Sequence, residues 1–354
     1  MQKIIVIKIG TSVLTDGAHV INNDVLRFYA RECKLLRRQG YASVFVVSGA
    51  VQLGRTETHT IADKKTLSAI GQVALSAAYR EAFAQQGLVT AQLLCSRHDI
   101  AKRHLFRAFQ RTLAGLIEQG VIPLLNENDA LTNGEIEAFG NNDMLAAVAA
   151  VAMSAEKLLL LTDQEGLYTA DPRFLEDARL VREVGDVTKE LFHYCNGPAS
   201  RQGVGGMIAK LKAAKTAIAG GVETIIARGN IRYRSHLSDI IAHKGPLTCF
   251  RPRRTHGALT NHDRWMLATR PSGALRIDGG AAAALRSKKS LLAVGIRDVT
   301  GRFQQGEIVR IIDRTKEEIG CGIVSLSSDA LKAMFAKGSP RNTDVIHCDH
   351  LIMY

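Results

Sequence analysis

The sequence predicts an α/β protein with three α/β/α layers around a mostly parallel central sheet, followed by a small β-rich C-terminal domain. Two observations support this fold class. Short apolar runs rich in β-branched residues alternate with longer helix-like segments up to about residue 227, and beyond about residue 270 short runs are separated by turns. Runs that are apolar on both faces are typical of parallel strands covered by helices on both sides.

Each element of the main sheet is predicted from a run that is apolar on both faces. These strand-like runs cover residues 4–9, 43–47, 90–94, 121–125, 157–161 and 223–227. The helix-like segments between them cover residues 22–39, 63–86, 103–119, 142–153 and 206–219. In the C-terminal part the predicted strands cover residues 291–294, 307–312 and 321–325, and one helix covers 328–335.

A change in amino-acid composition near Gly245 predicts a domain boundary. Prolines and arginines punctuate the stretch that follows, which has few long apolar runs. A chain of 354 residues is also long enough to divide into two domains. We therefore expect a catalytic domain at 1–250 and a second domain at 270–354, joined by a linker near 246–269.

Composition and charge narrow the class of protein. Hydrophobic residues make up 46% of the chain and charged residues 23%, as in globular proteins. The formal net charge is +12, and residues 251–354 alone hold 17 Lys and Arg against 10 Asp and Glu. Such an excess suits an anionic small ligand such as ATP, and it also suits RNA. Both interpretations stay open on charge alone.

The chain shows no targeting or membrane segment. No apolar run approaches the roughly 18 residues of a membrane span, and Met1 leads directly into a strand-like run rather than a signal peptide. We expect a cytoplasmic protein without membrane contacts. The cysteines are far apart and form no CxxC pattern, so buried, reduced thiols are expected rather than a disulfide scaffold or a metal site. They are Cys33, Cys95, Cys195, Cys249, Cys321 and Cys348.

Small and charged residues end the first two predicted strands, where ligands bind in open α/β sheets. Lys8 lies inside an apolar strand, and a buried ammonium needs a carboxylate or a phosphate as partner. The Gly-Thr-Ser turn after it offers backbone N–H groups to phosphate oxygens. Ser48 and Gly49 let a ligand approach the backbone closely. A structural ion pair at Lys8 and an ordinary turn at Ser48 are the alternatives.

A polar cluster follows the fourth predicted strand. Residues 126–129 read Asn-Glu-Asn-Asp, and Asn142 and Asp143 stand soon afterwards at the start of a helix. Helix capping is the alternative explanation for Asn142 or Asp143. Capping does not account for the earlier cluster. The combination favours recognition of a polar zwitterion.

Two later segments indicate a phosphate site. Residues 162–172 form a long polar loop after a buried strand, a common position for ligand binding. Residues 203–207 form a glycine-rich helix start, and Lys210 lies in the first turns of that helix. Backbone donors and a positive charge thus converge, as a bound phosphate requires, although a flexible linker would have the same composition. Neither a P-loop nor a protein-kinase signature is present, so another phosphoryl-transfer scaffold is needed.

Taken in order, these motifs resemble the amino-acid kinase family, in the branch that phosphorylates glutamate. The motifs cover residues 8–12, 47–50, 126–130, 140–143, 161–173 and 205–210. Residues from about 270 onward resemble the PUA domain that often follows this kinase domain, notably at 273–280 and 295–309. The resemblance implies the amino-acid kinase fold with a PUA-like C-terminal domain.

The resemblance also implies an activity and a site. The activity is ATP-dependent phosphorylation of the glutamate side-chain carboxylate, with Mg²⁺, as the first step towards proline. The implied ATP-binding residues are Lys8, Thr162, Asp163, Val204, Gly205, Gly206, Met207, Ile208, Ala209 and Lys210, of which Lys8, Lys210 and Asp163 are also the catalytic candidates. The implied glutamate-binding residues are Ser48, Asp129 and Asn142, with Asp143 in support. Further implications are a homo-oligomer, proline as feedback inhibitor and a transient glutamyl phosphate reductase partner.

The chain departs from the family pattern in two places. Val204, Ile208 and Ala209 stand where hydroxyl side chains are usual, and Gln52 and Leu53 stand where small residues are usual. The alternatives are a family member that acts on aspartate, acetylglutamate, carbamate or UMP, and an RNA-binding PUA protein with a weakened kinase domain. An acceptor carboxylate is already ionised at neutral pH, so the absence of an obvious catalytic histidine suits a carboxylate kinase.

Overall fold

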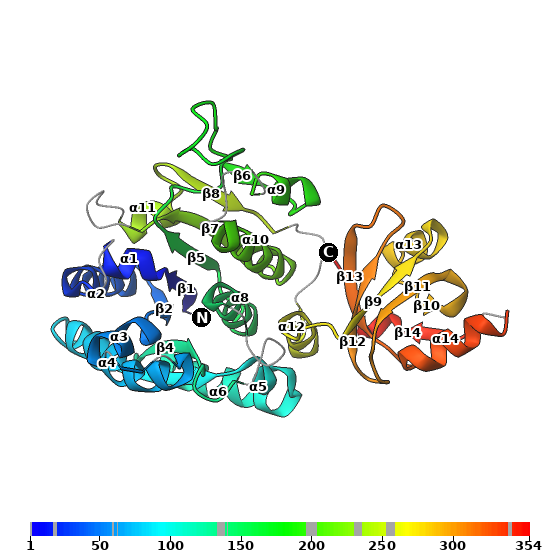
Figure 1. Cartoon of the computed structure of the whole chain (residues 1–354), viewed down its shortest axis with the longest axis horizontal. Coiled ribbons are helices and arrows are strands. Elements are labelled where there is room, and N and C mark those ends of the chain that lie inside the picture. The colour runs from blue at the N-terminus through cyan, green and yellow to red at the C-terminus, as the bar shows by residue number, and fades with distance from the viewer. Residues whose placement is uncertain are drawn as a thin grey trace. The chain divides into compact units, whose positions relative to one another are not determined.

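The computed structural model describes residues 2–16, 20–58, 60–61, 63–132, 139, 141–195, 204–229, 236–252, 259–338 and 342–354. The chain divides into two compact units, Met1–His256 and Gly257–Tyr354 (Figure 1). None of the helices in the described part of the chain is long and apolar enough to cross a membrane. All six cysteines are free thiols, and only Cys348 is not buried.

The first unit is built on an eight-stranded sheet in the order β3-β4-β2-β1-β5-β7-β8-β6. Its strands are β1 (Lys3–Ile9), β2 (Tyr41–Val46), β3 (Thr90–Cys95), β4 (Ile122–Glu127), β5 (Lys157–Thr162), β6 (Glu183–Val184), β7 (Glu223–Arg228) and β8 (Leu247–Phe250). Only β8 pairs antiparallel, with β7. The prediction of a mostly parallel sheet between helices is therefore confirmed.

Two strands of this sheet do not follow from the sequence pattern. β6 has two residues, too few for any periodicity. β8 lies in the proline- and arginine-punctuated stretch that the sequence assigned to the linker near 246–269. That stretch also contains a helix, α12 (Asn261–Ala268), so much of the expected linker is regular structure.

Helices cover both faces of the sheet (Figure 1). They are α1 (Thr11–Thr15), α2 (Asn23–Arg38), α3 (Ala50–Glu57), α4 (Lys64–Ala84), α5 (Arg97–Ala101), α6 (Arg103–Glu118), α8 (Asn142–Ala152), α9 (Lys189–His193), α10 (Val204–Ala219) and α11 (Leu237–Ile241). Alternate residues of β1, Ile5, Ile7 and Ile9, pack in one apolar core with α2 and α4. Since successive side chains of a strand point to opposite faces, Lys8 lies on the other face, which α8 contacts.

The start of α8 is fixed by a capping residue. The side chain of Asn141 accepts a hydrogen bond of 3.0 Å from the backbone N–H of Met144. Asn141 is thus the cap, and the side chains of Asn142 and Asp143 in the first turn have other partners. Helix capping, the alternative explanation for these two residues, does not apply to them.

A glycine contact holds α3 against α4. A β-carbon at Gly71 would lie 1.9 Å from the backbone oxygen of Ala50, and one at Gly54 would lie 2.0 Å from that of Leu67. The two helices therefore pack backbone to backbone. α3 begins directly after Gly49, whose φ of 110° is a left-handed conformation that favours glycine. This contact fixes the turn that carries Ser48.

Gly71→Ala is expected to lower the free energy of unfolding by at least about 2 kcal/mol, because the added methyl group overlaps backbone that cannot move independently. Gly115→Ala in the last turn of α6 is the control, since a β-carbon there meets no atom within 4 Å. The control should be neutral or stabilising by up to about 1 kcal/mol, from helix propensity. Denaturant unfolding measures both variants, and equal stability of the two would contradict the close packing of α3 on α4.

The second unit has its own core and a five-stranded sheet in the order β11-β9-β12-β13-β15, with β10 and β14 paired separately. Its strands are β9 (Gly273–Ile277), β10 (Leu291–Leu292), β11 (Ile296–Gly301), β12 (Ile308–Ile312), β13 (Glu318–Ile323), β14 (Asp344–Ile346) and β15 (Leu351–Met353). Its helices are α12, α13 (Gly279–Arg286) and α14 (Ser328–Ala336). The predicted helix at 328–335 is present, and α13 was not predicted.

Candidate active site

Two buried lysines share one buried carboxylate. Lys8 Nζ lies 3.0 Å from one oxygen of Asp143, and Lys210 Nζ lies 3.1 Å from the other. Only 8% of the surface of Lys8, 7% of that of Lys210 and 3% of that of Asp143 is exposed to solvent. They come from β1, α10 and α8, so the sheet and both helices must be in place to assemble the group. We call Lys8, Asp143 and Lys210 the lysine pair and its carboxylate.

This group carries one positive charge that no negative charge within it compensates. Two ammonium groups and one carboxylate leave a net charge of +1 in a place with little water, and an uncompensated buried charge is costly. Burial lowers the pKa of Lys8, and Lys210 lowers it further, while Asp143 opposes both. An anion bound beside the lysines would remove this cost. The group therefore favours a phosphate ligand over the purely structural ion pair.

A second polar group lies one residue away along α8. The side-chain amide nitrogen of Asn142 donates to Val47 O at 2.8 Å, to Ser48 Oγ at 3.0 Å and to Asn126 Oδ1 at 3.0 Å. These partners end β2 and β4. Neighbouring residues of α8 thus point into two different groups, Asp143 to the lysines and Asn142 to the strand ends.

The side-chain oxygen of Asn142 is the part of this group that lacks a partner. It is buried and has no hydrogen bond to any of the described residues. A buried acceptor without a donor costs roughly 1–3 kcal/mol. A ligand with an N–H or ammonium group would satisfy it.

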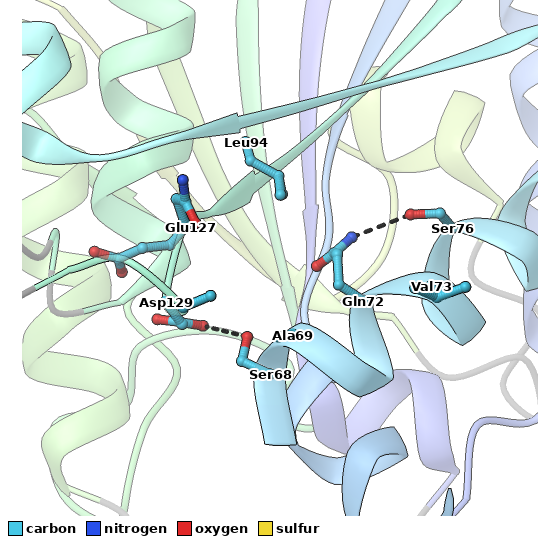
Figure 2. Close-up of a pocket in the computed structure, with 10 residues that line it drawn as sticks. Ser68, Ala69, Gln72, Val73, Ser76, Leu94, Glu127 and Asp129 are labelled. Carbon is cyan, nitrogen blue, oxygen red and sulfur yellow. Dashed lines mark hydrogen bonds between the residues drawn. The ribbon is translucent and has the colours of Figure 1, made fainter. Parts of the chain in front are cut away.

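A cavity of about 360 Å³ adjoins this second group (Figure 2). Residues of the loop after β4 line one side, and residues of α4 line the other. The lining residues are Ser68, Ala69, Gln72, Val73, Ser76, Leu94, Glu127, Asn128, Asp129 and Ala130. Figure 2 shows Ser68 of α4 directed at Asp129, with 3.5 Å between Ser68 Oγ and the carboxylate.

Hydrogen bonds connect the wall of the cavity to Asn142. The amide nitrogen of Asn126 donates to Gln72 Oε1 at 2.8 Å, and Gln72 Nε2 donates to Ser76 Oγ at 3.1 Å. Asn126 in turn accepts from Asn142. The sequence analysis did not single out Ser68, Gln72 or Ser76 as site residues. The signal that could have found them is their spacing of four, which puts polar side chains on one stripe of a helix.

Both carboxyl groups of the cavity resist ionisation. Burial raises the pKa of Asp129, against a smaller lowering by its contact with Ser68. Burial also raises the pKa of Glu127, and the nearby Asp129 adds to this effect, while a hydrogen bond from the backbone N–H of Phe139 and the charge of Arg97 oppose it. A cationic ligand group in the cavity would lower both pKa values.

The predicted nucleotide segments lie at the ends of β5 and α10. Thr162 is the last residue of β5, and its hydroxyl donates to Asp163 Oδ1 at 2.9 Å. Asp163 is exposed. Asp163 is one of the catalytic candidates implied by the family resemblance, as the residue that would orient the lysines or a metal-bound water; in the structure the carboxylate that contacts both lysines is that of Asp143.

The glycine-rich segment forms the first turns of α10, which begins at Val204. Gly206 is exposed, Met207 and Ile208 are half-buried, and Ala209 is buried beside Lys210. Gly140 and Gly203 of the predicted motifs lie outside the described residues, as does the side chain of Val204. A helix start leaves four backbone N–H groups without helical partners, and these attract anions.

The arrangement has the features of a kinase for small molecules: a three-layer α/β/α fold, a buried cationic group at the carboxyl edge of a parallel sheet, and a polar cavity beside it. Residues 3–228 match the amino acid kinase family, and residues 273–346 match the PUA domain. The chain belongs to the amino acid kinase family. The family resemblance drawn from the motifs is thereby confirmed.

Relatives with known names extend over nearly the whole chain. The glutamate 5-kinase of Erwinia tasmaniensis is 36% identical and aligns with 97% of this chain and 94% of its own length. The glutamate 5-kinase of Escherichia coli (strain K12 / DH10B) is 38% identical and aligns with 93% of this chain and 90% of its own length. Among solved structures, the UMP kinase from Ureaplasma parvum aligns with 71% of this chain and 99% of its own, with a TM-score of 0.49 and 15% identity.

Proposed function

We propose that the chain transfers the γ-phosphoryl group of ATP to the side-chain carboxylate of L-glutamate. A carboxylate oxygen attacks the γ-phosphorus, the bond to the β-phosphate oxygen breaks, and the products are glutamyl 5-phosphate and ADP. The observation that carries the proposal is the uncompensated positive charge of the lysine pair, one residue from the partnerless oxygen of Asn142. The two glutamate 5-kinase relatives support the choice of acceptor.

The lysine pair would supply charge stabilisation rather than acid–base chemistry. Phosphoryl transfer spreads negative charge over the transferred group, and fixed cations in a dry site stabilise that charge strongly. Asp143 holds Lys8 and Lys210 in place without cancelling their combined charge. The backbone N–H groups at the start of α10 would hold phosphate oxygens, because Ile208 and Ala209 have no hydroxyl to offer.

Mg²⁺ fits this site as a partner of the nucleotide. Both oxygens of Asp143 already contact a lysine, whereas Asp163 is an exposed carboxylate at the end of β5. Mg²⁺ keeps several waters and is usually held by one or two carboxylates together with substrate phosphates. Asp163 would therefore hold the ion, which would neutralise charge on the phosphates.

Glutamate would lie between the Asn142 group and the cavity. Its ammonium group suits the partnerless oxygen of Asn142 and the carboxylate of Asp129, and the strand end at Ser48 permits close approach of the ligand. Its side-chain carboxylate would then extend towards the lysine pair. The first turn of α8 brings the two groups together.

An ATPase assay with different acceptors tests the proposal. With Mg²⁺ and ATP, glutamate is expected to support turnover, and aspartate, acetylglutamate, carbamate and UMP are expected to support little or none. The similarity of the whole chain to glutamate 5-kinases does not favour these other acceptors, or RNA binding as the main role. Turnover with another acceptor but not with glutamate would overturn the proposal.

The affinity for glutamate is expected to fall in mildly acidic solution. Asp129 binds an ammonium group only when ionised, and its pKa lies above the usual 3.8. The KM for glutamate should therefore rise as the pH falls, before the usual aspartate range is reached, while the KM for ATP changes less. Asp129→Asn should reduce this pH dependence. The side chain of free glutamate has a pKa of about 4.3, whichever enzyme is present. The difference between the pH profiles of the unmodified enzyme and the Asp129→Asn variant therefore reports on Asp129. Identical profiles would contradict the role of Asp129 in binding glutamate.

The second unit is expected to be dispensable for chemistry. All the residues placed in the site precede residue 211, and each unit has its own core. A chain ending near residue 255 should keep measurable glutamate-dependent ATP turnover. Loss of all turnover in a truncated protein that is still folded, or tight and salt-sensitive RNA binding by residues 257–354, would contradict this division.

The remaining expectations concern partners. We propose that the protein acts in the cytoplasm as a homo-oligomer, with proline as feedback inhibitor. An acyl phosphate hydrolyses readily, which supports transient transfer of the product to a glutamyl phosphate reductase. Size-exclusion chromatography tests the homo-oligomer, and inhibition assays with proline test the feedback inhibition.

A further inference from the structure

Side chains that could bind a metal ion gather in one segment of the second unit, which contains none of the residues assigned to the active site. The short 3-10 helix Cys348–His350 connects β14 to β15 and follows His347. The backbone N–H of Cys348 donates to Ser290 Oγ at 3.2 Å. The segment is thus held between two strands and anchored to a third point of the unit.

Three different donor atoms in this segment face one another. His347 Nδ1 lies 3.9 Å from Cys348 Sγ and 3.5 Å from a carboxylate oxygen of Asp349. Cys348 Sγ lies 3.9 Å from the other oxygen of that carboxylate. In a tetrahedral zinc site the bond lengths place ligand atoms about 3.3–3.6 Å apart. The spacing of 3.5 Å lies within this range, and the two spacings of 3.9 Å exceed it by a few tenths of an ångström.

A backbone hydrogen bond indicates which nitrogen of the imidazole carries the proton. His347 Nδ1 accepts a hydrogen bond of 3.2 Å from the backbone N–H of Asp349. A neutral ring that accepts at Nδ1 carries its proton on Nε2. Nδ1 is therefore the ring nitrogen that can bind a metal ion, which would replace the hydrogen bond from Asp349.

One other group of three potential ligands occurs among the described residues, Glu223, His243 and Cys249. Its carboxylate already contacts Lys157, His243 and Arg251, and burial raises the pKa of Cys249 to about 11. A metal ion there would have to displace two cations and ionise a resistant thiol. Cys348, by contrast, is the cysteine that is not buried.

We propose that His347, Cys348 and Asp349 form a binding site for a divalent transition metal, with Zn²⁺ as the natural ion. Thiolate, imidazole and carboxylate together suit Zn²⁺ and Co²⁺ and not Mg²⁺. Binding releases the thiol proton of Cys348 to solvent. Three protein ligands leave the fourth position to water. The site was not indicated by the spacing of the cysteines, because it uses only one of them.

Co²⁺ titration of the full-length protein, reduced and free of nucleotide, tests the proposal. Coordination by Cys348 should produce a thiolate-to-cobalt charge-transfer band in the near ultraviolet, saturating at one ion per chain and abolished by added Zn²⁺. Cys348→Ser should remove the band. Asp349→Asn, which keeps the shape of the side chain, should weaken Co²⁺ binding at least about tenfold, the lower end of what loss of an outer-shell partner costs.

Two histidine variants serve as controls. His262 contacts His350 at 3.1 Å beside the site but is not one of the three ligands, so His262→Gln should keep the band. His243→Gln removes a ligand of the rival group and should also keep it. Thermal unfolding followed by circular dichroism should be unchanged in all four variants, which shows that both units remain folded. Absence of the band at about tenfold excess of Co²⁺, its survival in Cys348→Ser, or its loss in His243→Gln would overturn the proposal.

Discussion

Replacing Lys8 or Lys210 by alanine is expected to lower kcat at least about a hundredfold while the protein remains folded. Each substitution leaves one ammonium group paired with one carboxylate, so the net positive charge of the buried group falls to zero. The transition state of phosphoryl transfer then loses a fixed cation in a site that excludes water. The KM values should change less than kcat, because the charge to be stabilised grows as the reaction proceeds.

A lysine on the same helix provides the matched control. Lys212 lies two residues beyond Lys210 on α10 and is exposed to solvent, so Lys212→Ala removes a charge of the same kind without touching the buried group. Its kcat should stay close to that of the unmodified enzyme. Steady-state kinetics with saturating ATP and glutamate measure all three variants. A near-normal kcat in a folded Lys8 or Lys210 variant would refute the role given to the lysine pair.

Asp129→Ala and Asn142→Ala are expected to raise the KM for glutamate by about 10- to 100-fold, with a much smaller effect on the KM for ATP. Each change removes a hydrogen-bond acceptor for a charged ammonium group, and such bonds contribute roughly 1.5–3 kcal/mol. Asn142→Ala also removes the amide that joins Val47, Ser48 and Asn126. Its effect should therefore be the larger of the two.

Ser76→Ala separates ligand binding from general disturbance of the cavity. Ser76 lines the cavity, and its hydroxyl bonds with Gln72 and Gln92. The variant should leave the KM for glutamate nearly unchanged. Equal increases in the KM for glutamate and for ATP in the Asp129 and Asn142 variants would contradict the assignment of this region to the amino acid.

The sheet was predictable because its central strands are buried on both faces, a pattern that each apolar run shows locally. β8 was missed because its four residues stand among prolines and arginines, and its place in the sheet comes from pairing with β7. Within the site, residues near strand ends, such as Lys8 and Ser48, could be identified as candidates from the sequence. The pairing of Lys8 and Lys210 through Asp143 could not, because it joins segments 67 or more residues apart that only the fold brings together.

The adjacency of Asn142 and Asp143 has a mechanical consequence. Consecutive Cα atoms are separated by a fixed distance of about 3.8 Å. In the proposed reaction, the single peptide unit between Asn142 and Asp143 therefore sets the distance between the residues that bind glutamate and those that bind the phosphate. Most of α8 behind this peptide is buried on all sides and rich in alanine, which leaves it little freedom to tilt. Donor and acceptor would thus be kept in register by covalent geometry. A substitution that displaces α8 would move both substrates' contacts together and leave their mutual alignment intact.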